Sequence, residues 1–166
     1  NEKVAFEVAL AASICGVRAL ASMKHVGVNV AHDPLMTAGY IGAKGGLVLL
    51  SADDPSTWSS QNEQDNRYIA LQGYIPILEP SSVQEAKDMM ADAFKLSEQF
   101  GQLFMLRSVT RIGHARSDIT LGEISRERRK GQFIKDRTRL VYTPREARIN
   151  KPLMLERFER IKKAVK

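Results

Sequence analysis

One short apolar run decides the fold: Leu47-Val-Leu-Leu-Ser-Ala52, which two acids, Asp53 and Asp54, follow directly. A continuous apolar run of this length, preceded by Gly45-Gly46, predicts a strand that is covered on both faces, as in parallel sheets. Ligands bind at the carboxyl ends of the strands in such sheets. We therefore expect a functional site beside the two aspartates.

Helical and strand patterns alternate on both sides of this run. Capping residues and periodicity predict helices over 2–15, 33–43 and 83–100, the last one the longest and opened by a capping box at Ser82-Val-Gln-Glu85. Short apolar runs predict strands over 18–22, 75–78 and 103–106. The alternation predicts an α/β fold, a three-layer sandwich with a mainly parallel sheet.

The first helix carries apolar residues at helical spacing, and we expect them to face the core: Val4, Val8, Ala11 and Cys15. Cys15 is accordingly expected to be a small core residue rather than a nucleophile. The chain lacks an initiator Met, and helical periodicity runs from its first residues, so we expect its start to be a cut within a larger protein.

Charge divides the chain near Gly122. Residues 1–122 hold 10 Lys and Arg against 13 Asp and Glu, whereas 123–166 hold 15 against 6, giving −3 and +9. We therefore expect a domain over 1–122 and a basic connector over 123–166 with a C-terminal helix. Its basic residues include Arg126, Arg128, Arg129, Lys130, Lys162, Lys163 and Lys166, and its apolar residues are Leu153, Leu155, Phe158, Ile161 and Val165.

Composition limits the classes of function. Nucleic-acid binding by the basic tail remains the alternative to a connector, but aromatic residues for base stacking are sparse there. A single cysteine excludes an internal disulfide and a cysteine-ligated iron–sulfur cluster held by this chain alone. The three histidines have no metal-ligand spacing, so we expect no metal site. No apolar run approaches the ~20 residues of a membrane span, and a cytoplasmic setting is expected.

The polar loop after Asp53 is the strongest candidate site by residue type. Acids, amides and hydroxyls surround the only tryptophan, Trp58, over residues 53–67. A solvated surface loop is the simpler interpretation, although a lone exposed tryptophan usually needs a substrate or partner to cover it. Two other segments follow predicted strands and are expected to lie nearby, namely 24–29 and Thr110-Arg111.

Several blocks resemble, in order and spacing, the alpha subunit of indolepyruvate ferredoxin oxidoreductases, which are thiamine-diphosphate-dependent 2-oxoacid:ferredoxin oxidoreductases. The resemblance covers about the first 120 residues and implies the pyrimidine-binding domain of the thiamine-diphosphate fold over 1–122, with its N-terminal part missing. The blocks are Asn1–Ala5, Met23–Asn29, Asp33–Met36, Gly45–Val48, Asp53–Pro55, Ser59–Asp65, Leu78–Pro80, Arg107 and Thr110-Arg111.

The resemblance also implies residue roles. Glu2 matches the glutamate that hydrogen-bonds the pyrimidine ring nitrogen, and His25 matches a position where a polar or proton-donating group faces the substrate; both are candidate catalytic residues. Alone, Glu2 would be an acid near a helix start, and His25 a hydrogen-bonded loop histidine. Cofactor contacts are implied for Glu2, Val26, Gly27 and Asn29, and a substrate- or partner-facing surface for Ser59, Ser60, Gln61 and Arg67.

By resemblance, the complete enzyme oxidises arylpyruvates with coenzyme A to acyl-CoA, carbon dioxide and reduced ferredoxin. This chain would share a thiamine diphosphate site with the diphosphate-binding domain of the same enzyme and would be inactive alone. Magnesium and iron–sulfur clusters would belong to absent domains, since no Gly-Asp-Gly motif occurs here. Further implied partners are a beta/gamma-type subunit and ferredoxin. The alternatives are a pyruvate or 2-oxoglutarate enzyme, or a non-catalytic α/β interaction module with a basic arm.

Overall fold

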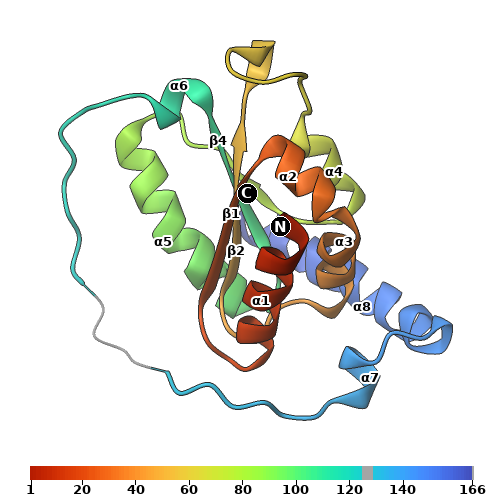
Figure 1. Cartoon of the computed structure of the whole chain (residues 1–166). Helices are drawn as coiled ribbons and strands as arrows, with labels where there is room; N and C mark the ends of the chain where they lie inside the picture. The colour runs from red at the N-terminus through yellow and green to blue at the C-terminus, as the bar shows by residue number, and fades with distance from the viewer. Residues whose placement is uncertain (125–128, 166) are drawn as a thin grey trace.

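The computed structural model describes residues 1–124 and 129–165, so Arg126, Arg128 and Lys166 lie outside the described residues. Four strands form one parallel sheet in the order β1-β2-β4-β3 (Figure 1). The expected α/β fold with a parallel sheet is confirmed. The elements in chain order are α1(Glu2–Ile14), β1(Ala19–Lys24), α2(His25–Val30), α3(His32–Ile41), β2(Leu47–Asp53), the 3-10 turn η1(Pro55–Thr57), α4(Asn66–Gln72), β3(Ile77–Leu78), α5(Val83–Phe100), β4(Phe104–Val109), α6(Thr110–Gly113), α7(Arg137–Leu140) and α8(Pro144–Ala164).

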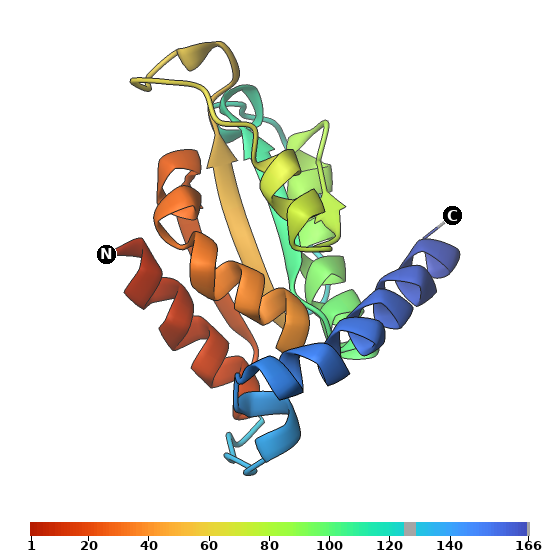
Figure 2. The same cartoon turned by 90° about the vertical axis from the view of Figure 1, so that its right-hand side faces the viewer.

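Helices cover both faces of the sheet, which gives three layers. Helices α1, α2, α3 and α4 lie on one face and α5 on the other (Figures 1 and 2). Two apolar clusters fill the spaces between the layers. Strand β2 contributes to both, because Leu47 and Leu49 join the cluster beneath α1–α4 while Val48 joins the cluster beneath α5. This alternation explains why Leu47, Val48 and Leu49 are all buried although they point to both faces of the sheet.

The predicted inward face of α1 was wrong. Val4 and Val8 are 57% and 64% exposed, whereas the buried side chains of this helix are Phe6, Ala9, Leu10 and Ser13. Cys15 is half-buried and caps the helix end. The error has a physical cause: α1 carries apolar residues on both sides, so helical spacing fits two stripes equally well.

Two local predictions also need correction. The segment 24–29, expected to be a loop, lies mostly within the short helix α2, whose Gly27 and Val28 are buried. The capping box of α5 is only half formed. The Ser82 hydroxyl accepts from the backbone N–H of Glu85, but the Glu85 carboxylate accepts from Ser81 instead of closing back on Ser82.

The C-terminal helix α8 packs against α3 and α5 (Figure 2). It begins at Pro144 and contains Pro152, and with 21 residues it is longer than the 18-residue α5, which the sequence had indicated as the longest helix. Met154 and Ile161 are buried, and Phe158 contacts Tyr74 edge-on with ring centroids 5.5 Å apart. This helix is therefore docked on the domain, although Leu155 remains 37% exposed. The domain limit near 122 stays a prediction.

Candidate functional site

Three strands end at one cavity of about 330 Å³. Lys24 closes β1, Asp54 follows β2 and Thr110 follows β4, and all three line the cavity with Ser59 and His114. Parallel pairing places these ends together, because Lys24 is level with Ala52. The sequence-based expectation that the three strand-end segments meet is confirmed.

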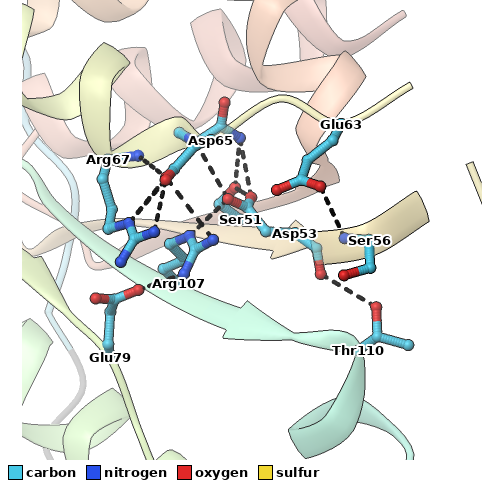
Figure 3. Close-up of polar contacts among 10 residues, drawn as sticks. Ser51, Asp53, Ser56, Glu63, Asp65, Arg67, Glu79, Arg107 and Thr110 are labelled. Carbon is cyan, nitrogen blue, oxygen red and sulfur yellow. Dashed lines mark hydrogen bonds and ion pairs between the residues drawn. The ribbon is translucent and has the colours of Figure 1, made fainter. Parts of the chain in front are cut away.

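A buried polar network holds the base of the loop that begins at Asp54. The Asp53 carboxylate accepts from the Ser51 hydroxyl at 2.5 Å, from both the backbone and the side-chain nitrogen of Asn66 at 3.2 and 3.1 Å, and from Arg107 at 2.6 Å (Figure 3). Asp53 and Asn66 stand at the two ends of the loop. The network therefore fixes the two ends against each other.

Arg107 projects from β4 into this network and meets three carboxylates. Its guanidinium lies 2.6 Å from Asp53, 2.5 Å from Glu79 and 3.7 Å from Asp65 (Figure 3). Burial alone would lower the pKa of Arg107, but the hydrogen bonds to Asp53 and Glu79 outweigh it, so the pKa is raised. The buried cation is thus fully compensated.

Asp54 organises the interior of the loop. Its carboxylate accepts from the backbone N–H of Trp58 at 3.2 Å and of Ser59 at 2.8 Å, and from the hydroxyls of Ser60 at 2.6 Å and Thr110 at 2.7 Å. These donors, chiefly Ser60 and then Thr110, hold the pKa of Asp54 well below its usual range. The loop therefore folds around a permanent negative charge.

Side chains from β1 and α2 tether the same loop from outside. Lys24 donates to the carbonyl of Ser59 at 2.6 Å, and His25 Nε2 lies 3.1 Å from the carbonyl oxygen of Asn62. The loop is therefore anchored rather than freely solvated. Trp58 nevertheless remains 81% exposed, so no described residue of this chain covers it.

Glu2 and Gly27, two of the predicted cofactor residues, are brought into contact. A Cβ added at Gly27 would lie only 2.6 Å from Cγ of Glu2 and 3.2 Å from its Oε1. Gly27 is buried and Glu2 half-buried, so α1 and α2 cross where the glycine leaves room for the carboxylate-bearing chain. Val26 is half-buried and Asn29 exposed on the same short helix.

His25 is fully buried, and its Nδ1 has no hydrogen-bond partner among the described residues. Of the residues expected to face substrate or partner, Ser59 and Gln61 are exposed on the loop while Ser60 is bound to Asp54. Arg67 pairs with Asp65 at 2.6 Å, at the loop's closing end. Ser59, Ser60 and Gln61 thus lie together on the loop, whereas Arg67 points toward Asp65 of its own segment.

Sequence reasoning assigned no role to Arg107, Glu79 or Asn66. Arg107 did carry a signal, since it is the only charged residue in the strand Phe104–Val109. Glu79 was named only within the resemblance block Leu78–Pro80, and its contact with Arg107 depends on the β3–β4 pairing, which local spacing does not show. Within residues 1–124 and 129–165, no group of three or more His, Cys, Asp or Glu side chains is placed to hold a metal ion, and no helix is both long and apolar enough to cross a membrane.

No protein-family model matches the chain. Curated relatives match nearly all of it: over 98% of its length it is 53% identical to the indolepyruvate oxidoreductase subunit IorA of Pyrococcus horikoshii and to that of Pyrococcus abyssi, and 52% identical to that of Thermococcus kodakarensis. The chain spans about a quarter (26%) of the length of these relatives. By this similarity the chain is a homologue of one segment of the indolepyruvate oxidoreductase IorA subunits.

Proposed function

We propose that this chain forms the aminopyrimidine side of a thiamine diphosphate site in an indolepyruvate oxidoreductase. The observation that carries the proposal is the contact between Glu2, the first residue of α1, and Gly27 in α2. This contact holds the Glu2 carboxylate against the backbone of α2. A glycine here lets the Glu2 side chain approach the backbone of α2 closely, and any larger residue would displace Glu2.

The residues present fit such a cofactor. Glu2, Val26, Gly27 and Asn29 offer a carboxylate, an apolar surface, an open backbone and an amide on two adjoining helices. When bound, thiamine diphosphate supplies an electron sink for decarboxylation of a 2-oxoacid. The task of Glu2 would be to share a proton with the pyrimidine ring nitrogen, and the unpartnered Nδ1 of His25 is a further group able to accept or donate a proton beside α2.

The anchored loop would present Ser59, Ser60 and Gln61 toward the substrate channel or a partner subunit. Its tethers at Asp54 and Lys24 support this role, because a positioned loop orders reacting groups better than a mobile one. The exposed Trp58 suits a surface that another part of the enzyme covers.

For the whole enzyme we propose oxidation of indolepyruvate, or another arylpyruvate, with coenzyme A to acyl-CoA, carbon dioxide and reduced ferredoxin. The names of the relatives favour this substrate over pyruvate and 2-oxoglutarate. The diphosphate-binding domain with its magnesium, the iron–sulfur clusters and the beta/gamma-type subunit would lie outside this chain. The relatives' names and the docked tail also weigh against a separate interaction module with a free basic arm.

Substitution of Glu2 in the whole enzyme tests the proposal. Glu2→Gln keeps the size of the side chain but cannot share the proton, so we expect turnover to fall ~10²–10⁴-fold. Glu7→Gln, an exposed change on the same helix, is the matched control and should leave turnover near the parent value. Equal turnover in both variants, with thiamine diphosphate bound, would contradict the proposed role.

A further inference from the structure

A second cavity, of about 300 Å³, lies at the opposite edge of the sheet, between α8 and the segments that precede β2 and β4. Three arginines line it: Arg139 from α7, and Arg157 and Arg160 from α8. The rest of the wall is mostly apolar or backbone and consists of Ala43, Phe100, Gly101, Leu153 and Glu156. None of these residues takes part in the site described above.

Arg139 and Arg157 are held by the C-terminal end of α3. Arg139 donates to the carbonyls of Ile41 at 2.5 Å and Ala43 at 3.0 Å, and Arg157 donates from one nitrogen to the carbonyls of Gly39 at 3.0 Å and Tyr40 at 2.9 Å. Cations are favourable at a helix C-terminus, so these contacts orient both side chains. They also bring two positive charges to one wall of the cavity.

The carbonyl contacts do not satisfy these guanidinium groups. A guanidinium has five N–H donors, and Arg157 Nε is buried with no hydrogen-bond partner in the part of the chain that the structure describes. Asp136 partly offsets the charge of Arg139. Within the described residues, however, no carboxylate forms an ion pair with Arg139, Arg157 or Arg160, and Glu156 is the single acid among the lining residues.

The pKa of Arg157 agrees with this shortage of hydrogen-bond and ion-pair partners. Burial, and then the neighbouring charge of Arg139, lower the pKa of Arg157 to about 10. Gly42, with φ +68°, makes room for this close approach, since a Cβ there would lie 2.9 Å from Nη1 of Arg157. The fold therefore keeps two half-buried cations side by side beside an open cavity, an arrangement that an anion would stabilise.

We propose that this cavity is an oxyanion site that takes a phosphate or phosphoryl group, with Arg139 and Arg157 as its ligands and Arg160 at its rim. Planar guanidinium groups recognise phosphate oxygens through paired hydrogen bonds, and two of them converge here. Phe100 and Leu153 add apolar surface to the wall beside the guanidinium groups. The inference does not rest on the proposed function.

Calorimetric titration of the whole protein with inorganic phosphate tests the site, in chloride buffer of matched ionic strength. We expect saturable binding and a thermal midpoint that rises with phosphate. Arg157→Gln and Arg139→Gln should each weaken binding at least tenfold. Arg148→Gln removes the same charge from an exposed position on α8 and should leave the affinity unchanged. Equal loss in the Arg148 control would identify general charge attraction and overturn the site.

Two further arms complete the experiment. Arg160→Gln alters only an exposed side chain at the rim, so it should weaken phosphate binding even if the Arg139 and Arg157 variants fail to fold. ADP competes with phosphate if the site takes the phosphoryl group of a nucleotide, whereas an absence of competition identifies free phosphate as the ligand. A titration with no saturable heat, or an affinity that no arginine substitution changes, would overturn the proposal.

Discussion

At the carboxyl edge of the sheet Arg107 meets three carboxylates, whereas at the opposite edge Arg139 and Arg157 meet backbone carbonyls and one another. The first arrangement raises the pKa of its arginine and the second lowers the pKa of both. The compensated charge of Arg107 belongs to the network that holds together the two ends of the loop with the proposed substrate-facing residues. Uncompensated charge accompanies a cavity that can receive an anion.

Removal of Arg107 is the strongest way to test this contrast. Arg107→Met should lower the free energy of unfolding by about 3–5 kcal/mol, because it leaves the buried Asp53 carboxylate without its cation. Urea denaturation of the whole protein measures the loss. Arg67→Met removes a largely exposed partner of Asp65 and should cost at most about 1 kcal/mol. Equal losses in the two variants would show that the network is not a buried unit.

The same substitution at Arg157 should have a smaller effect. Arg157→Met loses hydrogen bonds to two carbonyls but also removes a half-buried charge that no carboxylate of the described residues pairs with, so we expect a loss of about 1–3 kcal/mol. Measuring this loss without phosphate, in the same denaturation assay, allows a direct comparison with the loss in Arg107→Met. A loss as large as that of Arg107→Met would mean that the carbonyl contacts compensate this charge as fully as carboxylates do.

The smallest expected effect concerns the stability of the protein at acidic pH. The pKa of Asp54 lies below its ordinary value of 3.8, so its contribution is fully present above that value and is lost as the pH falls further. Asp54→Asn should therefore flatten the decline in stability below about pH 4. Hydrogen exchange of the Trp58 and Ser59 amides, followed at matched pH, should be faster in the variant. Unchanged protection of both amides would show that the carboxylate does not hold the loop.

The sequence was most informative where a residue pattern is compatible with only one local structure. The run Leu47–Ala52 is apolar on both of its faces, which only a doubly covered strand satisfies, and parallel pairing then brings Lys24, Asp54 and Thr110 together. The prediction failed for α1, because Val4 and Phe6 lie on opposite sides of a helix that carries apolar residues on both of those sides.

Contacts between distant positions could not be predicted from a single sequence. Arg107 and Glu79 lie 28 residues apart, and Arg139 and Ile41 lie 98 apart. Both pairs depend on the way in which whole elements pack, not on local spacing. Glu2 and Gly27 are a partial exception, since the family resemblance named both residues although spacing alone did not join them.

A structure of the whole protein with thiamine diphosphate bound tests the central claim most directly. The measured quantity is the distance from the Glu2 carboxylate to the pyrimidine ring nitrogen. Our account predicts a hydrogen bond, at roughly 2.6–3.2 Å, with the ring beside the backbone of Gly27. A pyrimidine ring bound elsewhere, with Glu2 facing solvent or another protein group, would contradict it.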